Sequence, residues 1–198
     1  MAQNEIAPFP VVVIGGSAGS LEVLLGIVRG LPVNTNAVIV VVVHRRNDSE
    51  SVLEDIIAHL TRLRVAEVED KDMVEPGSVY IAPPDYHLLF EGEGSFSLDS
   101  SERVNYSRPS IDVTFESVAG VFGKRALGIL LSGANADGAA GLLAMRVAGC
   151  HTIAQNPATA DVDFMPRQAI NLNAAVEIID AAGMSNAVNH FIASLSKM

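Results

Sequence analysis

The chain has 198 residues with no internal repeat and no linker long enough to separate domains, so we expect residues 1–198 to form one domain. Its formal net charge of −10 argues against nucleic acid as a general partner, because phosphate binding depends on a basic surface. The longest apolar run, Ala37 to Val43, is too short to span a bilayer, and no basic segment leads into a signal region. With Cys150 as its only cysteine, the chain forms no internal disulfide. These properties predict a cytoplasmic protein without membrane insertion.

The predicted elements alternate between strand and helix. Val11 to Ile14 is a β-branched run that stops at two glycines, which is typical of a buried strand. Leucine and valine then recur at helical spacing from Leu21 until Gly30-Leu31-Pro32 ends the pattern. The run Ala37 to Val43 has no polar residue, as expected for a parallel strand covered on both faces. The remaining predicted elements are a helix over 51–63, strands over 65–68 and 78–81, a hairpin over 88–98, a helix over 112–122, a strand over 126–131, a helix over 138–148 and a strand over 152–154.

This alternation predicts an α/β fold. We expect a doubly wound, mostly parallel β-sheet flanked by helices, a Rossmann-like three-layer arrangement, with a small β-hairpin. In open sheets of this kind the ligand site lies beyond the carboxyl ends of the strands. Functional residues are therefore expected where the strands end.

Polar residues of complementary chemistry follow predicted strands at Ser17, His44 and Asp137. A hydroxyl nucleophile, an imidazole that takes its proton and a carboxylate that fixes the imidazolium are the groups of an acyl-transfer triad. Gly15 to Gly19 fits the pattern G-x-S-x-G, in which small neighbours let the serine occupy a strained turn at a helix N-terminus. The Ala18 N–H at that helix end is a candidate oxyanion donor. The order Ser, His, Asp differs from the Ser, Asp, His order of ordinary α/β-hydrolases.

Each of these residues also has a purely structural interpretation. Ser17 is compatible with a helix N-cap or a phosphate contact, and His44 with a hydrogen-bonded strand end. Asp137 is compatible with an N-cap of the helix that starts near Gly138. These alternatives stay open for each residue taken alone.

Two other kinds of site compete with an esterase. In a nucleotide or sugar-phosphate binding protein, phosphates would lie at the first helix N-terminus and at Arg45-Arg46, but Gly15 to Ser20 misses G-x-G-x-x-G and no acidic residue ends the second strand. A metal site would combine His44 with the other polar residues near strand ends, Asp85, His87 and Asp112. There is no HExxH and no paired-cysteine motif, so we predict no metal and no cofactor, and Cys150 is most simply a small buried hydrophobe.

Several segments together resemble, in chain order, the catalytic domain of the CheB family, the protein-glutamate methylesterases of bacterial chemotaxis. Val13 to Gly19 resembles the nucleophile turn of that family, and His44 follows a long apolar strand as the catalytic histidine of the family does. The other matching segments are Tyr80 to His87 (Y-I-A-P-x-D-x-H), Arg108 to Asp112 (R-P-S-x-D), Gly133 to Ala139 (the turn with the catalytic aspartate) and Met165 to Arg167 (M-P-[RK]).

The resemblance implies a serine carboxylesterase in which Ser17 is the nucleophile, His44 the general base and then acid, and Asp137 the residue that orients His44. The implied substrates are glutamyl γ-methyl esters on the cytoplasmic helices of methylated chemoreceptors, which are hydrolysed to glutamate and methanol. Some family members also deamidate receptor glutamines. A relative that has lost activity and serves as an interaction module is a further alternative. We also expect Arg45 and Arg46, beside His44, to form a local patch that attracts acidic helices.

Three features depart from the family pattern. The usual Ser-Thr-Gly-Gly turn reads Ser17-Ala18-Gly19-Ser20. Ala134 and Asn135 replace a methionine and a glycine, and the methionine position is thought to supply a backbone oxyanion donor. Typical members carry an N-terminal receiver domain that is phosphorylated on aspartate, whereas the first strand here begins at about Val11, so the sequence predicts no receiver domain and no such control.

Overall fold

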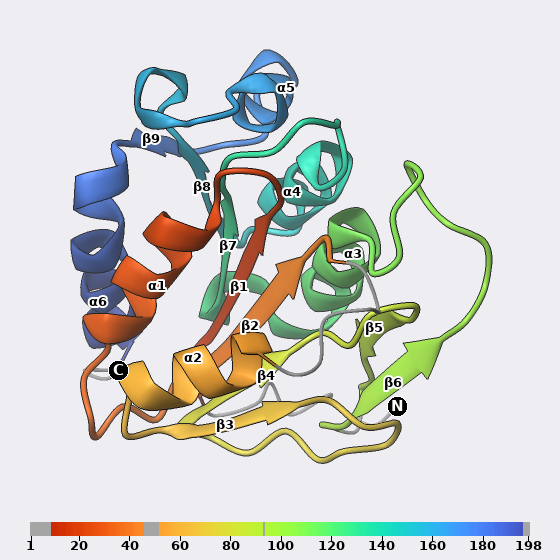
Figure 1. The fold of residues 1–198 in the computed structure, drawn as a ribbon, viewed down its shortest axis with the longest axis vertical. Coiled ribbons are helices and arrows are strands. Elements are labelled where there is room, and N and C mark those ends of the chain that lie inside the picture. The colour runs from red at the N-terminus through yellow and green to blue at the C-terminus, as the bar shows by residue number, and fades with distance from the viewer. Residues whose placement is uncertain (1–8, 46–51, 93, 196–198) are drawn as a thin grey trace.

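A parallel sheet forms the centre of the fold (Figure 1). The computed structural model describes residues 9–45, 52–92 and 94–195, and within these ranges the sheet has seven strands. In spatial order they are β3 (Arg64–Glu67), β4 (Ser78–Ile81), β2 (Val38–Val43), β1 (Val11–Gly16), β7 (Ala126–Leu130), β8 (His151–Gln155) and β9 (Glu177–Ile179). Every neighbouring pair is parallel, as the alternation of strands and helices predicts.

Helices cover both faces of this sheet, which gives the three predicted layers (Figure 1). One face carries α1 (Leu21–Arg29), α2 (Val52–Leu60) and α6 (Met184–Leu195). The other carries α3 (Ile111–Phe122), α4 (Ala139–Val147) and α5 (Phe164–Asn171). No helix among the described residues is both long enough and apolar enough to cross a bilayer.

The continuous apolar strands follow from burial on both faces. In β1, Val11 and Val13 belong to the core beneath α3 and α4, whereas Val12 and Ile14 belong to the core beneath α1 and α6. Side chains alternate between the two faces of a strand, so a strand covered on both sides has no position for an exposed polar residue. Full burial of each such side chain contributes about 1.5–3 kcal/mol.

A small hairpin lies apart from the main sheet, as predicted. Its strands, β5 (His87–Phe90) and β6 (Phe96–Asp99), are antiparallel and β5 contacts α3. The Thr114 hydroxyl of α3 donates to the Leu88 carbonyl at 2.8 Å, and the Phe90 and Phe122 rings meet edge to face at 5.1 Å. The hairpin thus fixes α3, whose N-terminus reaches the strand ends described below.

Three elements, α5, β9 and α6, follow residue 154, where no element is predicted from the sequence. Strand β9 has only three residues, and its Glu177 and Ile178 side chains are exposed, so the apolar residues here do not show the pattern of a buried strand. Helix α6 did leave a signal, because Met184, Val188 and Ile192 recur at intervals of four and are buried.

The strand order places a topological switch point at β1. The chain passes from β1 through α1 to β2 on one side of it, and β7 joins later on the other side. The carboxyl ends of β2, β1 and β7 are consequently neighbours, and Ser17, His44 and Asp137 follow these strand ends. This is where ligands bind in open α/β sheets.

Candidate active site

Ser17 occupies the turn between β1 and α1. Its N–H donates to the Ser132 carbonyl at 2.9 Å, and its carbonyl accepts from the Ser20 hydroxyl at 2.7 Å. The half-buried Ser17 hydroxyl makes no hydrogen bond within the described part of the chain. The N-cap residue of α1 is Ser20 rather than Ser17, so the cap interpretation of Ser17 is wrong.

The glycines before Ser17 are required by their surroundings. A Cβ on Gly15 would lie 2.4 Å from Cγ2 of Ile111 in α3, and one on Gly16 would lie 2.6 Å from Cβ of Ser20. Neither approach leaves room for a side chain. The small residues of the G-x-S-x-G pattern therefore let the serine turn pack against both α1 and α3.

His44 stands beside Ser17 because their strands are in register. Gly16 pairs with Val43 across β1 and β2, and the His44 N–H donates to the Gly16 carbonyl at 3.3 Å. The ring Nε2 lies 2.8 Å from Oδ2 of Asp137. An ionised carboxylate only accepts hydrogen bonds, so Nε2 carries the proton and the Nδ1 lone pair of the neutral ring is free to act as a base.

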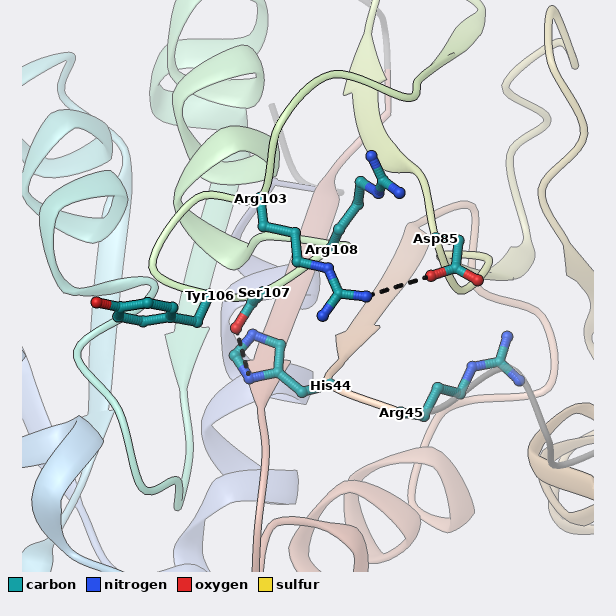
Figure 2. Close-up of a pocket in the computed structure, with 7 residues that line it drawn as sticks. All are labelled: His44, Arg45, Asp85, Arg103, Tyr106, Ser107 and Arg108. Carbon is teal, nitrogen blue, oxygen red and sulfur yellow. Dashed lines mark hydrogen bonds and ion pairs between the residues drawn. The ribbon is translucent and has the colours of Figure 1, made fainter.

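The hydroxyl closest to that base in the structure belongs to Ser107. Its Oγ lies 3.4 Å from Nδ1 of His44 (Figure 2). The same oxygen also accepts from the Asn135 amide at 3.1 Å. The 3.4 Å separation makes it a weak hydrogen bond. The free protein thus holds Ser107 at the nitrogen that a nucleophile would use.

Asp137 is fully buried and saturated with donors. Besides His44, its carboxylate accepts from the Ile111 N–H at 2.7 Å, the Ser110 hydroxyl at 2.7 Å and, more weakly, the Asp112 N–H at 3.3 Å. Burial alone would raise the pKa of Asp137, but the hydrogen bonds from His44, Ser110 and Ile111 outweigh it and hold that pKa below its ordinary value. The group therefore stays ionised at neutral pH.

The carboxylate of Asp137 accepts hydrogen bonds from the N-terminus of α3, and not from that of α4 as the N-cap interpretation requires. Helix α4 is capped by Gly138 at φ +90° with no side-chain cap bond, so the interpretation of Asp137 as its N-cap is wrong. Instead the carboxylate lies at the N-terminus of α3, next to the N-cap residue Ser110. The positive end of the α3 dipole further favours its charge.

A second buried carboxylate, Asp112, adjoins this network. It accepts from the Gly141 N–H at 2.7 Å and from the Asn105 amide at 2.8 Å, and the same amide reaches Asp137 at 3.4 Å. Burial, with the nearby charge of Asp137, raises the pKa of Asp112 to about 6. Asn105 therefore bridges two carboxylates with opposite pKa shifts.

The alternative of a metal site formed with His87 finds no support among the described residues. Both ring nitrogens of His87 are occupied, because Nδ1 accepts from the Ser110 N–H at 3.1 Å and Nε2 donates to the Glu102 carbonyl at 3.0 Å. The described residues contain no group of three or more histidines, cysteines or acids at metal-binding distances. Cys150 is buried, and burial raises the pKa of its thiol to about 11, which agrees with its interpretation as a small hydrophobe.

His44 lies between two cavities of different chemistry. The first, about 260 Å³, contains Ser17 and His44 and is otherwise lined mainly by apolar side chains of α1, α2 and β2, among them Leu21, Val43 and Leu53. The second, about 450 Å³, lies on the Ser107 side and is polar (Figure 2). A group that enters the first cavity meets both the Ser17 hydroxyl and the His44 ring.

The loop before Asp137 differs from the family pattern but is well anchored. Asn135 accepts the Asp137 N–H at 3.2 Å through its side-chain oxygen, and its amide reaches Ser107. Within the described ranges, neither the Ala18 N–H nor the Ala134 N–H makes a hydrogen bond. Both backbone donors remain available at the strand ends where an oxyanion would form.

Four polar contacts of the site were missed by the sequence analysis, because they depend on tertiary structure. Ser110 lies in the R-P-S-x-D segment, but nothing local shows that it donates to Asp137. Asn105 and Ser107 belong to a turn with no recognisable signal, and Asn135 was noted only as a departure from the family.

Comparison with known proteins identifies the family of the chain. A family model described as CheB methylesterase matches residues 12–188. The chain belongs to the CheB methylesterase family.

Curated relatives and a solved structure agree with membership of the CheB methylesterase family. A Leptospira interrogans protein named putative protein-glutamate methylesterase/protein-glutamine glutaminase is 41% identical over 162 residues, which cover 82% of this chain and 84% of the relative. The Escherichia coli K12 protein-glutamate methylesterase/protein-glutamine glutaminase is 38% identical over 177 residues, 88% of this chain but 50% of the relative. The crystal structure of the Thermotoga maritima CheB methylesterase catalytic domain superimposes with a TM-score of 0.88 at 33% identity, covering 93% of this chain and 99% of that one.

These findings favour the esterase interpretation over the nucleotide-binding alternative. The chain spans about half the length of the Escherichia coli relative and most of the Leptospira one.

Proposed function

We propose that this CheB-family chain is a serine esterase that hydrolyses glutamyl γ-methyl esters on chemoreceptor helices. The observation that carries the proposal is the 2.8 Å contact between His44 Nε2 and the buried Asp137 carboxylate, directly beside Ser17 at the N-terminus of α1. The names of the Leptospira and Escherichia coli relatives support this substrate class.

In the first half of the reaction, the Ser17 hydroxyl oxygen attacks the ester carbonyl and its proton passes to Nδ1 of His44. Asp137 holds the opposite nitrogen, so it fixes the ring and stabilises the imidazolium that forms. The Ala18 and Ala134 N–H groups are the proposed donors to the oxyanion, aided by the dipole of α1. Methanol then leaves with the proton from His44, and Ser17 carries the glutamyl acyl group.

In the second half, His44 Nδ1 takes a proton from water, and the resulting nucleophile attacks the acyl group on Ser17. Collapse of this intermediate releases the glutamate side chain, and the proton returns to the Ser17 oxygen. The mainly apolar cavity around Ser17 would keep bulk water from the acyl group until the leaving methanol makes room. With glutamine as substrate the same steps release ammonia instead of methanol, which supports the glutaminase activity given in the names of the relatives.

A fluorophosphonate probe and a methanol-release assay test this proposal together. We expect the probe to label Ser17 and the protein to release methanol from methylated receptor, and both signals to be lost in Ser17→Ala and His44→Ala. Ser194→Ala is the matched control, because that hydroxyl lies on the exposed side of α6 and bonds only to the Phe191 carbonyl of its own helix.

Other outcomes identify the alternatives. Labelling without methanol release would retain the nucleophile but require another ester. Absence of both signals in a folded protein would favour an inactive interaction module.

A further inference from the structure

The larger cavity beside His44 has a charge opposite to that of the chain. Its lining includes the guanidinium groups of Arg45, Arg103 and Arg108 and one carboxylate, that of Asp85 (Figure 2). The chain as a whole carries a formal net charge of −10. Cations are therefore concentrated where the proposed substrate would enter.

Arg45, expected with Arg46 to form a local attractive patch, is already paired. Its Nη2 forms an ion pair with Glu67 and also donates to the Ala82 carbonyl at 3.3 Å, so it ties the end of β2 to its neighbours in the sheet. Arg46, the other member of the expected patch, lies outside the described residues. The positive charge that would attract an acidic substrate therefore comes mainly from the other arginines of the cavity, Arg103 and Arg108.

Arg108 contributes a positive charge with unused donor capacity. Its Nη1 donates to the carbonyls of Ser100 and Ser101, each at 2.6 Å, and no carboxylate of the described chain forms an ion pair with it. The Nε atoms of Arg108 and Arg45 are buried and lack an acceptor among these residues. The terminal Nη2 of Arg108 makes no hydrogen bond within the described ranges, so it can donate to an acceptor in the cavity.

Arg103 also lines the cavity, and 61% of its side chain is exposed. Its ion pair with Asp85 is long, at 3.9 Å, and in Figure 2 its guanidinium group extends between His44 and Asp85. Exposed pairs of this kind are weak. A carboxylate with better geometry would replace Asp85 at little cost.

Tyr106 marks the same entrance with an exposed ring. It is 96% exposed and sits with φ +62° beside Asn105 at φ +50°, in a two-residue turn closed by hydrogen bonds between Val104 and Ser107. Such turns favour asparagine and glycine, so tyrosine is strained there. The Asn105 amide, which bonds Asp112 and Asp137, anchors the turn and keeps the ring in water.

We infer that this cavity binds a carboxylate side chain of the polypeptide substrate, close to the glutamyl ester that reacts at Ser17. Arg103 and Arg108 are the specificity-determining residues, and Tyr106 covers the apolar part of the bound segment. This inference rests on the proposed esterase function, because His44 lines both the reaction cavity and the arginine cavity. The inference adds that the enzyme prefers substrates with a negatively charged residue near the glutamyl ester.

Two helical peptides of identical length test the inference. Each carries one glutamyl γ-methyl ester, and the residues one helical turn before and after it are glutamate in one peptide and glutamine in the other. We expect kcat/KM for the glutamate peptide to be about tenfold higher at low salt, the size of effect that a charge-assisted hydrogen bond provides, and the preference to shrink in 0.5 M salt.

The arginine variants then locate the preference. Arg103→Gln is expected to lower it to about threefold or less, and Arg103→Lys to retain most of it, because lysine keeps the charge. Arg64→Gln is the matched control, since Arg64 is a similarly exposed arginine on β3 that pairs with Glu75 away from the cavity. Arg108→Gln is measured with its urea unfolding midpoint, because Arg108 also holds the loop at Ser100.

The outcomes separate this inference from the proposed function. Hydrolysis of both peptides with equal kcat/KM, or a preference that Arg103→Gln leaves unchanged, overturns the inference alone. If neither peptide is hydrolysed, the esterase proposal fails. Binding of the labelled peptides, followed by fluorescence anisotropy, then decides the carboxylate site separately: equal Kd values for the two peptides overturn it, and tighter binding of the glutamate peptide that Arg103→Gln abolishes supports it.

Discussion

The Nδ1 atom of His44, rather than Nε2, is the ring nitrogen that the proposed mechanism uses, because Asp137 occupies Nε2. In the free protein the Ser107 hydroxyl lies at this nitrogen, whereas the Ser17 hydroxyl lines the adjoining cavity. Catalytic hydrogen bonds are often loose before substrate binds. Removal of the Ser107 hydroxyl therefore distinguishes the two hydroxyls as nucleophile.

Ser107→Ala should preserve labelling and raise the rate of probe attachment at Ser17 about twofold to fivefold. The variant removes a weak hydrogen bond of about 0.5–1 kcal/mol that competes for Nδ1. The measurement is the labelling rate together with mass spectrometry of the labelled peptide. Loss of labelling in Ser107→Ala, or a label attached to Ser107, would show that Ser107 is the nucleophile and would contradict the role proposed for Ser17.

Asp137→Asn should lower kcat by about 10⁴-fold, because an amide no longer imposes the required tautomer on His44. It should also destabilise the fold by about 1–3 kcal/mol, since an amide nitrogen in place of Oδ2 faces the Ile111 N–H, which is also a donor. Steady-state kinetics and urea unfolding are measured on the same sample. Asp163→Asn, in an exposed pair with Arg167, serves as the control and should change neither quantity appreciably. A fully active Asp137→Asn protein would exclude the proposed role.

Helices α3 and α4 are in close contact at Gly141. A Cβ there would lie 2.7 Å from the Asp112 carbonyl oxygen and 2.8 Å from Cβ of Phe115, and the Gly141 N–H also binds the Asp112 carboxylate. The glycine thus lets α4 reach the buried carboxylate network of the site.

Gly141→Ala should destabilise the protein by about 1–3 kcal/mol, although alanine is the better helix former, because the backbone of α3 must move away. Gly26→Ala provides the matched control in α1, where nothing lies within 4 Å of the added Cβ, and should stabilise by about 0.5–1 kcal/mol. Denaturant unfolding of both variants measures the difference. Equal changes in the free energy of unfolding at the two positions would show that the close α3–α4 contact does not oppose a side chain at position 141.

Local patterns predict the elements of the central sheet well, because β-branched runs and helical spacing are set by burial on two faces. They also predict that Ser17 and His44 follow neighbouring strand ends, since parallel strands end at one edge. They do not predict the donors to Asp137, because the segment from Asn105 to Asp112 reaches it only after α3 has packed on the sheet. Nor do they predict β9, a three-residue strand at the sheet edge whose Ile178 side chain stays exposed.

Across the protein, stability should depend on pH through two buried carboxylates with opposite effects. Asp137 has a lowered pKa, so its contribution is present above the unfolded pKa near 4 and is lost as pH falls through its folded value. Asp112 has a pKa raised to about 6, so the folded state holds the extra proton between about pH 4 and 6. The stabilising contribution of the protonated Asp112 is therefore present below about pH 4 and is lost as pH rises to about 6.

Asp112→Asn should remove the second effect. The free energy of unfolding of the variant, relative to the parent protein, should rise between pH 4 and pH 7 by up to about 3 kcal/mol, since one pKa unit corresponds to about 1.4 kcal/mol. Urea unfolding at a series of pH values measures this. Parallel stability curves for the two proteins would contradict the raised pKa of Asp112.

The hydrogen bonds of Asp137 also constrain the order of events during folding. One carboxylate joins His44, 93 residues away in sequence, to the first turn of α3. The base is therefore oriented only when β2, the loop after β7 and α3 have all assembled. Recovery of esterase activity during refolding should consequently coincide with completion of the native structure, so that no partly folded chain exposes a working nucleophile.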